Sequence, residues 1–132
     1  MDILEPTPLL GGLSPQRFMR RHWQKQPLLV RQAVPGGMAL LSRAQLFALA
    51  THSEVESRLV VQTVQARADE RVSARPHWRL RDGPIPRRAL PPLGQPGWTL
   101  LVQGLDLHVD AAHELLARFR FVPDARLDDL ML

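Results

Sequence analysis

The chain has 132 residues, which is enough for one domain and short for two. Its apolar content of 45% is ordinary for a globular protein, and the lack of cysteine excludes disulfides and thiolate metal sites and fits a reducing cytoplasm. The net charge is +4, the acidic and proline-broken N-terminus does not resemble a secretory signal, and no apolar run is long enough to span a bilayer, so we expect a cytoplasmic protein.

The first forty residues predict an arm, a helix and a strand. Residues 1–13 are rich in Pro and Gly and are expected to form an N-terminal arm. Ser14 followed by proline is typical of a helix start, and the helix should end near Gln26 because the next proline disfavours helix before it. The run "PLLVRQAV" (27–34) then predicts a short buried strand, closed by a turn at 35–37.

The middle of the chain predicts one helix and several strands. The stretch "SRAQ" at Ser42 is a capping box, which favours a helix immediately after it. A turn is expected at Asp82-Gly83, followed by a proline-rich loop at 84–97. Strands are predicted at 57–64, 77–80 and 97–105.

The last third predicts a helix and the beginning of a strand. Asp110 should cap the helix "AAHELLARF", and a final strand should begin near Leu127. The strands are joined largely by loops and hairpins, so the sequence predicts an α+β fold with mostly antiparallel pairing rather than a doubly wound parallel sheet.

The positive charge is concentrated in one stretch. Residues 67–88 contain seven arginines against three acidic residues, and they therefore carry the whole net charge of the chain. Such a stretch can steer an RNA or ribosomal partner. It can equally be a solvated hairpin, which is the commoner situation for a charge block without a docking motif. Both interpretations stay open.

The His-Val-Asp triplet at 108–110 is the only sequence that looks like part of a catalytic site. A His-x-Asp pair with a distant second histidine forms the facial triad of non-haem Fe(II) enzymes. Here only His113 follows, inside the predicted helix, so the ligand set is incomplete. We interpret the triplet as a decoy, with His108 in an exposed turn and Asp110 as the helix cap.

Other polar residues give no complete site either. Asp128 and Asp129 would point to opposite faces of a strand, which argues against joint acid–base action. His22 is expected to be a half-buried packing residue, and His77 beside a tryptophan either stacks on a base or packs locally. The residues alone therefore predict no catalytic, cofactor-binding or metal site in this chain.

Three stretches match motifs of one known family. "RRHWQKQPLLVRQAV" is similar to "RHWQKRP", "ALATHSEVESRLV" to "LAMESEVDSRLV", and "GWTLLVQGLDLHVDAAHELLARFRFVPDARLDDLM" to "WSLLVQAVNHW…ALMRPFRELPDWRIDDLM". These motifs are those of the bacterial ribosomal oxygenases, and the chain resembles that family in their order and rough spacing from Phe18 to Met131. Residues 67–96 match poorly and resemble a variable basic hairpin.

The resemblance implies a JmjC-type, cupin-fold enzyme that uses Fe(II) and 2-oxoglutarate to hydroxylate an arginine of a large-subunit ribosomal protein. In that family the iron-binding His-x-Asp follows the "DDLM" strand, beyond Leu132, and the triplet at 108–110 does not align with it. No iron or 2-oxoglutarate ligand is therefore carried over to this chain. Asp128 and Asp129 are expected to shape the substrate mouth or to serve as scaffold. The other matching residues are expected to be scaffold: His22, Trp23, Glu54, Ser57, Arg58, Trp98 and Gln103.

Residues 14–132 are thus expected to be the incomplete N-terminal part of a JmjC/cupin domain that is inactive alone. The closing "DDLML" would be the first strand of its double-stranded β-helix, or jelly roll. Such a fragment should leave a sheet edge and apolar faces uncovered and should self-associate. Two alternatives stay open: a non-catalytic module that docks on RNA or the ribosome through 67–88, and a subunit completed by a second polypeptide.

Overall fold

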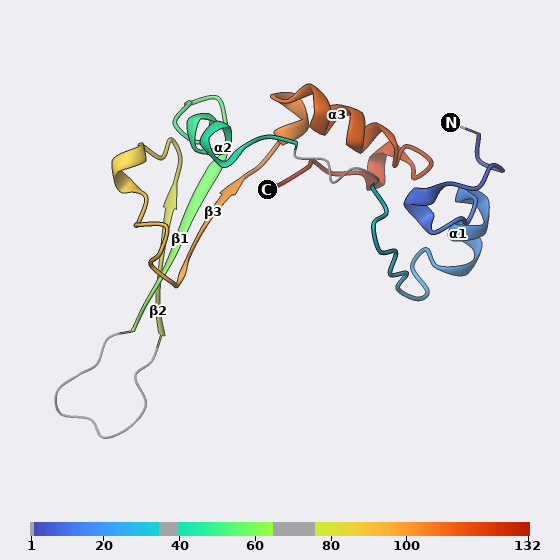
Figure 1. Cartoon of the computed structure of the whole chain (residues 1–132), viewed down its shortest axis with the longest axis horizontal. Coiled ribbons are helices and arrows are strands. Elements are labelled where there is room, and N and C mark those ends of the chain that lie inside the picture. The colour runs from blue at the N-terminus through green and yellow to red at the C-terminus, as the bar shows by residue number, and fades with distance from the viewer. Residues whose placement is uncertain (1, 35–39, 65–75) are drawn as a thin grey trace, which may run out of the picture. The chain divides into compact units, whose positions relative to one another are not determined.

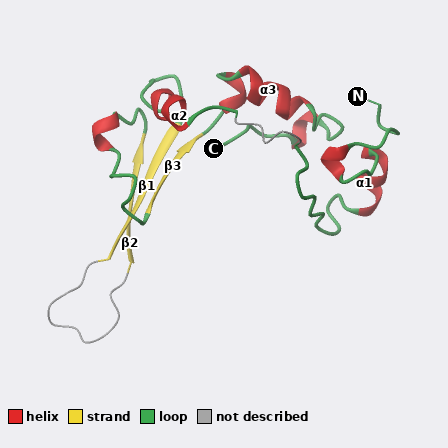
Figure 2. Cartoon of the chain, viewed as in Figure 1, coloured by secondary structure: helices red, strands yellow, loops and turns green. Residues whose placement is uncertain are grey.

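Two helices, three antiparallel strands and a third helix follow one another along the chain, in a computed structural model that describes residues 2–34, 40–64 and 76–132. The helices are α1 (Pro15–Arg21), α2 (Arg43–Leu49) and α3 (Asp110–Ala117). The strands are β1 (Ser57–Val64), β2 (Pro76–Asp82) and β3 (Trp98–Val102), and they lie in the order β2-β1-β3 with β1 antiparallel to both neighbours (Figures 1 and 2). The predicted α+β class with antiparallel pairing is confirmed.

The chain divides into two compact units. The first unit comprises Met1–Leu40 and Glu114–Asp128, and the second comprises Leu41–His113 and Asp129–Leu132. The sheet and α2 belong to the second unit, whereas α1 belongs to the first. Each unit is considered below by itself.

In the first unit, α1 begins where the sequence predicts. Ser14 is the N-cap, its hydroxyl accepts a hydrogen bond from the Arg17 N–H at 3.3 Å, and proline occupies the first helical position. The predicted end was wrong, because α1 stops at Arg21 instead of near Gln26. Gln24 adopts a positive φ of 54°, which turns the chain out of the helix before the proline is reached.

The strand predicted at 27–34 is wrong. No strand is assigned in this range, Leu29 is 80% exposed, and Gln32 has a positive φ of 53°. A strand needs a neighbour to receive its backbone hydrogen bonds, and the described part of the first unit contains no strand to provide them. The turn predicted at 35–37 lies outside the described residues.

Aromatic rings form the centre of the first unit. Phe18 stacks on His22 with ring centroids 5.9 Å apart, contacts Trp23 at 6.5 Å, and meets Phe121 edge-on at 5.8 Å. His22 is half-buried, as predicted for a packing residue. Its Nδ1 atom is fully enclosed and has no hydrogen-bond partner among the described residues.

The second unit begins with the predicted capping box. The Ser42 hydroxyl accepts from the Gln45 N–H, and the Gln45 side-chain oxygen accepts from the Ser42 N–H at 2.8 Å. The end of α2 contacts the sheet, because the Ser57 hydroxyl donates to the Ala50 carbonyl. The strand predicted at 57–64 is confirmed as β1.

The two faces of the sheet differ in burial. Residues that pair across strands point to the same side, so Ser57, Leu59, Leu100 and Val102 share one face, and all four are buried. The core continues from this face to Ile85, Leu105 and Ala112, none of which is exposed. The opposite face carries Val60, Trp78, Leu80 and Leu101, of which Trp78 and Leu80 are 60% and 64% exposed.

The turn after β2 depends on a close backbone approach. The Gly83 N–H donates to the Ser57 carbonyl at 2.7 Å, and a Cβ atom on Gly83 would lie 2.3 Å from the Ser57 hydroxyl. Only glycine fits there without movement of the neighbours. The predicted loop at 84–97 is present, with one 3-10 turn at Arg87–Ala89.

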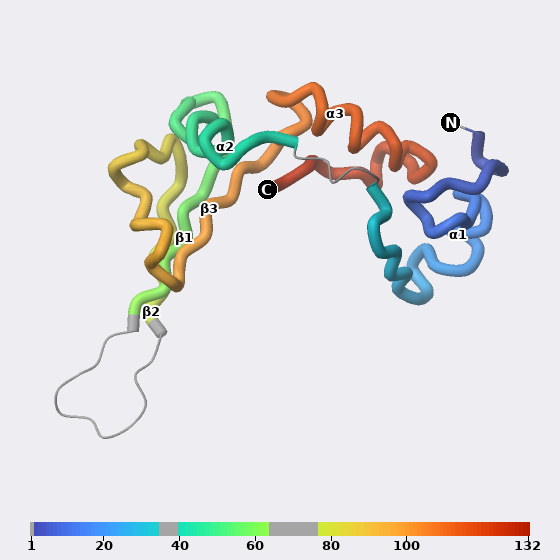
Figure 3. Tube along the Cα trace, in the orientation of Figure 1, coloured from blue at the N-terminus to red at the C-terminus, as the bar shows by residue number. Residues whose placement is uncertain are grey.

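The end of the chain departs from the prediction in three details. β3 ends at Val102 rather than at 105, where a 3-10 turn, Leu105–Leu107, begins. α3 begins at Asp110 itself, so Asp110 lies in the first helical turn and is not the predicted cap. No strand is assigned after Leu127, although Leu132 exchanges two hydrogen bonds with Val102 and the segment runs beside the end of β3 (Figure 3).

Within residues 2–34, 40–64 and 76–132, no helix is both long enough and apolar enough to cross a membrane.

Candidate functional site

Two aspartates fasten the C-terminal segment to the loop that follows β3. The Asp129 carboxylate accepts a hydrogen bond from the Gly104 N–H, and the Asp106 carboxylate accepts one from the Leu130 N–H at 2.9 Å. The Leu105 N–H also donates to the Leu130 carbonyl at 2.9 Å. We call these two reciprocal carboxylate contacts the aspartate clamp. Hydrogen bonds to charged acceptors are stronger than neutral ones, so the clamp gives this junction a fixed geometry.

Asp128 and Asp129 have different surroundings although they are adjacent. Asp129 is half-buried and belongs to the second unit, whereas Asp128 is exposed and belongs to the first. The contact made by Asp129 favours a scaffold role for it. The open position of Asp128 leaves its carboxylate free to meet solvent or a ligand.

Sequence reasoning missed Asp106. The predicted strand 97–105 placed this residue immediately after a strand, with no reason to single it out. Its partner Leu130 is 24 positions away, and that separation leaves no local pattern. The available signal was a Leu-Asp pair that occurs in both "QGLDL" and "RLDDL". A repeated dipeptide is too short to be a specific signal.

The triplet at 108–110 lies on the surface. His108 and Asp110 are both exposed, with His108 in the turn that ends the Leu105–Leu107 segment, as predicted. Asp110 at the start of α3 is favourably placed near the positive end of the helix dipole. Among the described residues, no group of three or more His, Asp or Glu side chains is arranged to hold a metal ion. These donors therefore do not fit the iron site that the family resemblance implies for a complete enzyme.

The local contacts of Glu54 lower the pKa of its carboxyl group below the ordinary value. A hydrogen bond from its own backbone and another from the Ser53 hydroxyl lower its pKa, with smaller contributions from His52 and His108. The His52 Nδ1 atom lies 3.6 Å from the Glu54 carboxylate. All of these side chains are exposed, so the group is a solvated surface cluster.

Several residues that match the family motifs have structural contacts. Ser57 is buried and holds the end of α2, as described above. The Trp98 indole N–H donates to the Pro92 carbonyl at 3.3 Å and thereby closes the proline-rich loop. Arg58 lies 2.9 Å from Glu56 and 3.5 Å from Asp82, an exposed arrangement that contributes little to stability.

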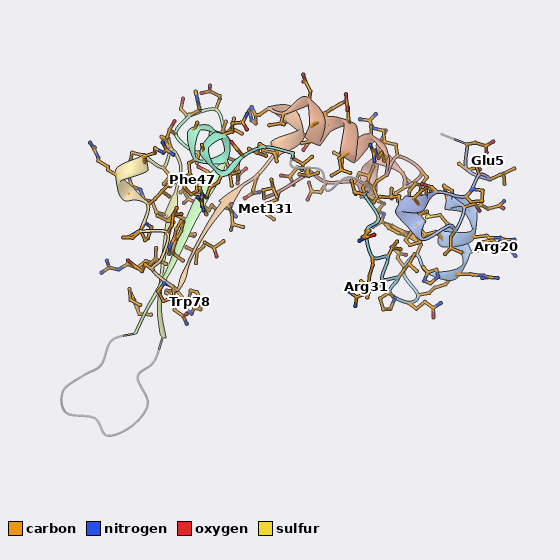
Figure 4. The ribbon with its side chains drawn as sticks, viewed as in Figure 1. Glu5, Arg20, Arg31, Phe47, Trp78 and Met131 are labelled. Atoms are coloured by element: carbon orange, nitrogen blue, oxygen red, sulfur yellow. The ribbon has the colours of Figure 1, made fainter. Side chains whose placement is uncertain are left out.

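The described part of the basic stretch 67–88 includes an open edge strand. His77, Trp78, Arg79, Leu80 and Arg81 are consecutive in β2 and all are exposed. Figure 4 shows Trp78 on this strand. Arg79 and Arg81 alternate with Trp78 and Leu80, so the strand presents arginines on one side and apolar side chains on the other.

Comparison with known proteins finds the same relatives in sequence and in structure. No family model matches the chain. The "Ribosomal protein uL16 3-hydroxylase" of Escherichia coli is 34% identical over 115 residues, which cover 87% of this chain and 27% of the relative. The "Probable ribosomal oxygenase" of Haemophilus influenzae is 27% identical over 120 residues, which cover 91% of this chain and 27% of the relative.

Solved structures give the same result for the fold. The E. coli ribosomal oxygenase YcfD superimposes with a TM-score of 0.69 at 34% identity, over 90% of this chain and 29% of that one. One structure of YcfD contains cobalt and 2-oxoglutarate, and another contains cobalt and succinic acid. The chain spans less than a third of the length of these relatives. Over nearly all of its own length, therefore, this chain is similar in sequence and in fold to one portion of the ribosomal oxygenases.

Proposed function

We propose that this chain forms the N-terminal portion of a cytoplasmic, 2-oxoglutarate- and Fe(II)-dependent oxygenase that hydroxylates an arginine of a large-subunit ribosomal protein. The observation that carries the proposal is the similarity to the E. coli ribosomal oxygenase, at 34% identity and a TM-score of 0.69 over 90% of this chain. The order of the matching motifs in the sequence supports the same assignment. Iron and 2-oxoglutarate would be held by residues outside this chain.

The proposed role of these 132 residues is to support the catalytic barrel. In this proposal the aspartate clamp of Asp106 and Asp129 fixes the position of the segment that enters the barrel. Asp128 is exposed beside it and would lie at the substrate mouth, where a carboxylate can pair with an arginine guanidinium. No chemical step is assigned to any residue of this chain, because its described donors do not fit the metal.

A chimera tests the proposal directly. The portion of the E. coli relative that this chain matches would be replaced by residues 1–132, and Fe(II)-dependent succinate formation and hydroxylation of the ribosomal protein would be measured by mass spectrometry. We expect activity within about tenfold of the parent enzyme, which corresponds to about 1.4 kcal/mol in the barrier. Residues 1–132 alone should show no turnover.

Two controls make the chimera test informative. A chimera carrying Asp106→Asn and Asp129→Asn should lose activity and stability together, whereas one carrying Glu5→Gln should behave as the unmodified chimera. A folded chimera without succinate formation, beside an active parent, would contradict the proposal. Reading the coding DNA beyond codon 132 is a further check, because a continuing frame should reach a glycine-rich turn and a His-x-Asp.

The second candidate function is docking on RNA or the ribosome through the basic stretch 67–88. The observation that favours it is the exposed edge strand β2, which presents Arg79 and Arg81 on one face and Trp78 on the other. The Arg79→Gln, Arg81→Gln double variant would then weaken RNA binding and reduce its salt dependence. Unchanged RNA binding in this variant would remove the candidate.

We also propose that the isolated chain self-associates or is completed by a second polypeptide. The exposed Trp78 and Leu80 side chains and the open edge of β2 support this. Size-exclusion chromatography with light scattering should give species larger than a monomer. A monodisperse monomer with a cooperative unfolding transition would count against both forms of the proposal.

A further inference from the structure

Three arginines converge on one surface of the first unit. Arg17, Arg20 and Arg21 of α1 line one partly open hollow. Arg20 and Arg21 lie three and four residues after Arg17, so each is a neighbour of Arg17 on the helix surface, with Cβ atoms about 5–6 Å apart. All three are exposed, and Figure 4 shows the Arg20 side chain extending away from α1. We call this set the α1 arginine cluster.

The cluster stands on a well-fixed backbone. The Ser14 cap and the proline after it define the start of α1, and both residues are buried. The Phe18 ring on the other side of the helix packs against His22 and Phe121. Charged groups on a rigid element lose less conformational freedom when they bind than groups on a loop.

The arginines are not needed to complete the helix. The carbonyl of Arg20 is satisfied by the Lys25 ammonium at 2.6 Å, and the Phe18 carbonyl accepts from the His22 N–H at 2.8 Å. Among the described residues, the observed ion pairs lie around Glu54 and Arg58 in the second unit, and none involves the cluster. α1 itself contains no acidic residue. The three guanidinium groups therefore remain available, with the ammonium of Lys25 close to the same helix end.

The chemistry of the cluster selects among possible partners. The exposed residues between Gln16 and Lys25 are all polar: Gln16, Arg17, Arg20, Arg21, Gln24 and Lys25. The exposed apolar side chains of this unit, Ile3, Leu4 and Leu29, lie outside that stretch. Protein interfaces usually have an apolar or aromatic centre, whereas every exposed side chain of α1 is polar. A polar, arginine-rich surface is typical of contacts to a phosphate backbone, because the planar guanidinium pairs with two phosphate oxygens at once.

We infer that the α1 arginine cluster is a docking surface for the phosphate backbone of RNA. This surface is separate from the basic stretch 67–88, and the inference does not depend on the proposed oxygenase function. It assigns the first unit a role in positioning the protein on an RNA-containing partner. It predicts no preference for base sequence, because phosphate contacts carry none.

The test measures the salt dependence of RNA binding by the full chain. The probe is a fluorescein-labelled, 20-nucleotide oligouridine, followed by fluorescence anisotropy between 50 and 200 mM NaCl. The variant is Arg17→Gln, Arg20→Gln, Arg21→Gln. Loss of three phosphate contacts should make the negative slope of log K against log salt shallower by about 2. The ratio of the affinities at 50 and 200 mM NaCl should therefore fall by about twentyfold.

A matched control separates the surface from net charge. Arg118, Arg120 and Arg126 are also exposed arginines of the first unit, and their triple glutamine variant removes the same charge. It should retain the wild-type slope. Replacing the three arginines of the α1 arginine cluster by lysine keeps the positive charge but removes the planar guanidinium groups that pair with two phosphate oxygens at once. This variant should bind with intermediate affinity.

Each outcome decides the inference. Selective loss in the α1 variant, with an unchanged circular dichroism spectrum, supports it. Equal loss in both triple variants would show a net-charge effect and overturn it, and so would absence of RNA binding by the wild type. Loss only in the Arg79→Gln, Arg81→Gln variant would assign binding to β2 instead. Arginine-dependent binding to phosphatidylserine vesicles without RNA binding would make the partner a membrane.

Discussion

Different interactions stabilise the interior of each of the two units. The second unit has a hydrogen-bonded sheet and a core of fully enclosed aliphatic side chains, including Ile85, Val102 and Leu105. The first unit has no strand among its described residues and combines half-buried aromatic rings around Phe18 with the buried side chains of Leu10 and Val122. Aliphatic burial and sheet pairing act over the whole second unit, whereas ring contacts act locally. We therefore expect the second unit to determine global stability and the first to open more easily.

The largest expected effect comes from opening the core of the second unit. Leu105→Ala removes a side chain that is 0% exposed and should lower the free energy of unfolding by about 2–5 kcal/mol. Urea denaturation followed by circular dichroism measures the change. Leu29→Ala in the first unit removes a leucine that is 80% exposed and should cost less than about 0.5 kcal/mol. Similar losses in the two variants would contradict the difference in burial between Leu105 and Leu29.

The contact between Gly83 and Ser57 should give the next largest effect. Gly83→Ala places a Cβ atom against the Ser57 hydroxyl, and the resulting shift should destabilise the second unit by about 1–3 kcal/mol. Gly94→Ala is the matched control, because no atom lies within 4 Å of its Cβ position. Adding Ser57→Ala to Gly83→Ala should recover part of the loss. A Gly83→Ala protein as stable as the Gly94→Ala control would contradict this geometry.

Asp129 belongs to the aspartate clamp and the adjacent Asp128 does not, so substitutions at these two positions should differ in their effect on stability. Asp129→Asn weakens a hydrogen bond to a charged acceptor and should cost about 1.5–3 kcal/mol. Asp128 is exposed, so Asp128→Asn should change the free energy of unfolding by less than about 0.5 kcal/mol. A double-mutant cycle of Asp106→Asn with Asp129→Asn should show coupling, since both hold the same segment. Additive losses in the cycle would mean that the two contacts act independently.

The two helix caps allow the same substitution to be compared in each unit. Ser14→Ala and Ser42→Ala each remove a hydroxyl that accepts from the third helical residue, and each should cost about 1 kcal/mol. Hydrogen exchange should show increased opening of α1 only for Ser14→Ala, and of α2 only for Ser42→Ala. Coupled loss of protection in both helices would indicate that the units unfold as one.

The smallest effect is electrostatic and belongs to Glu54. Its folded-state pKa lies below the ordinary value of 4.5, so its charged form is favoured in the folded state. The resulting stabilisation is present above that ordinary pKa and is lost as the pH falls through the lower, folded-state pKa. Glu54→Gln should remove this small acid-dependent step in urea midpoints. A variant with the wild-type pH profile would show that the exposed interactions are fully screened.

Local signals predicted the parts of the fold that local contacts create. The starts of α1 and α2 depend on Ser14 and Ser42, whose partners lie three residues away, and both were predicted correctly. β1 was predicted over its full length from its β-branched residues. The run 27–34 has a similar apolar pattern but did not form a strand, because strand formation depends on a neighbour that the pattern does not reveal.

The candidate site could be predicted only in part. The sequence singled out Asp128 and Asp129 and indicated that they do not act as a pair. It gave no reason to connect Asp129 with Gly104, because that contact joins positions 25 residues apart. The α1 arginine cluster was not predicted, because the densest run of arginines in the sequence lies at 67–88. Helical spacing within "QRFMRR" was the available signal.

The register between Val102 and Leu132 also has a directional consequence. Val102 directs its N–H and carbonyl away from β1, toward Leu132, and residues two positions apart in a strand face the same way. The backbone N–H and carbonyl groups of Leu100 and Trp98 therefore point to the same edge of β3, away from β1. A designed peptide appended after Leu132 would pair with Leu100 and Trp98 and add a strand to the sheet. Insertion of a single residue before that peptide would move each of its side chains to the opposite face of the sheet.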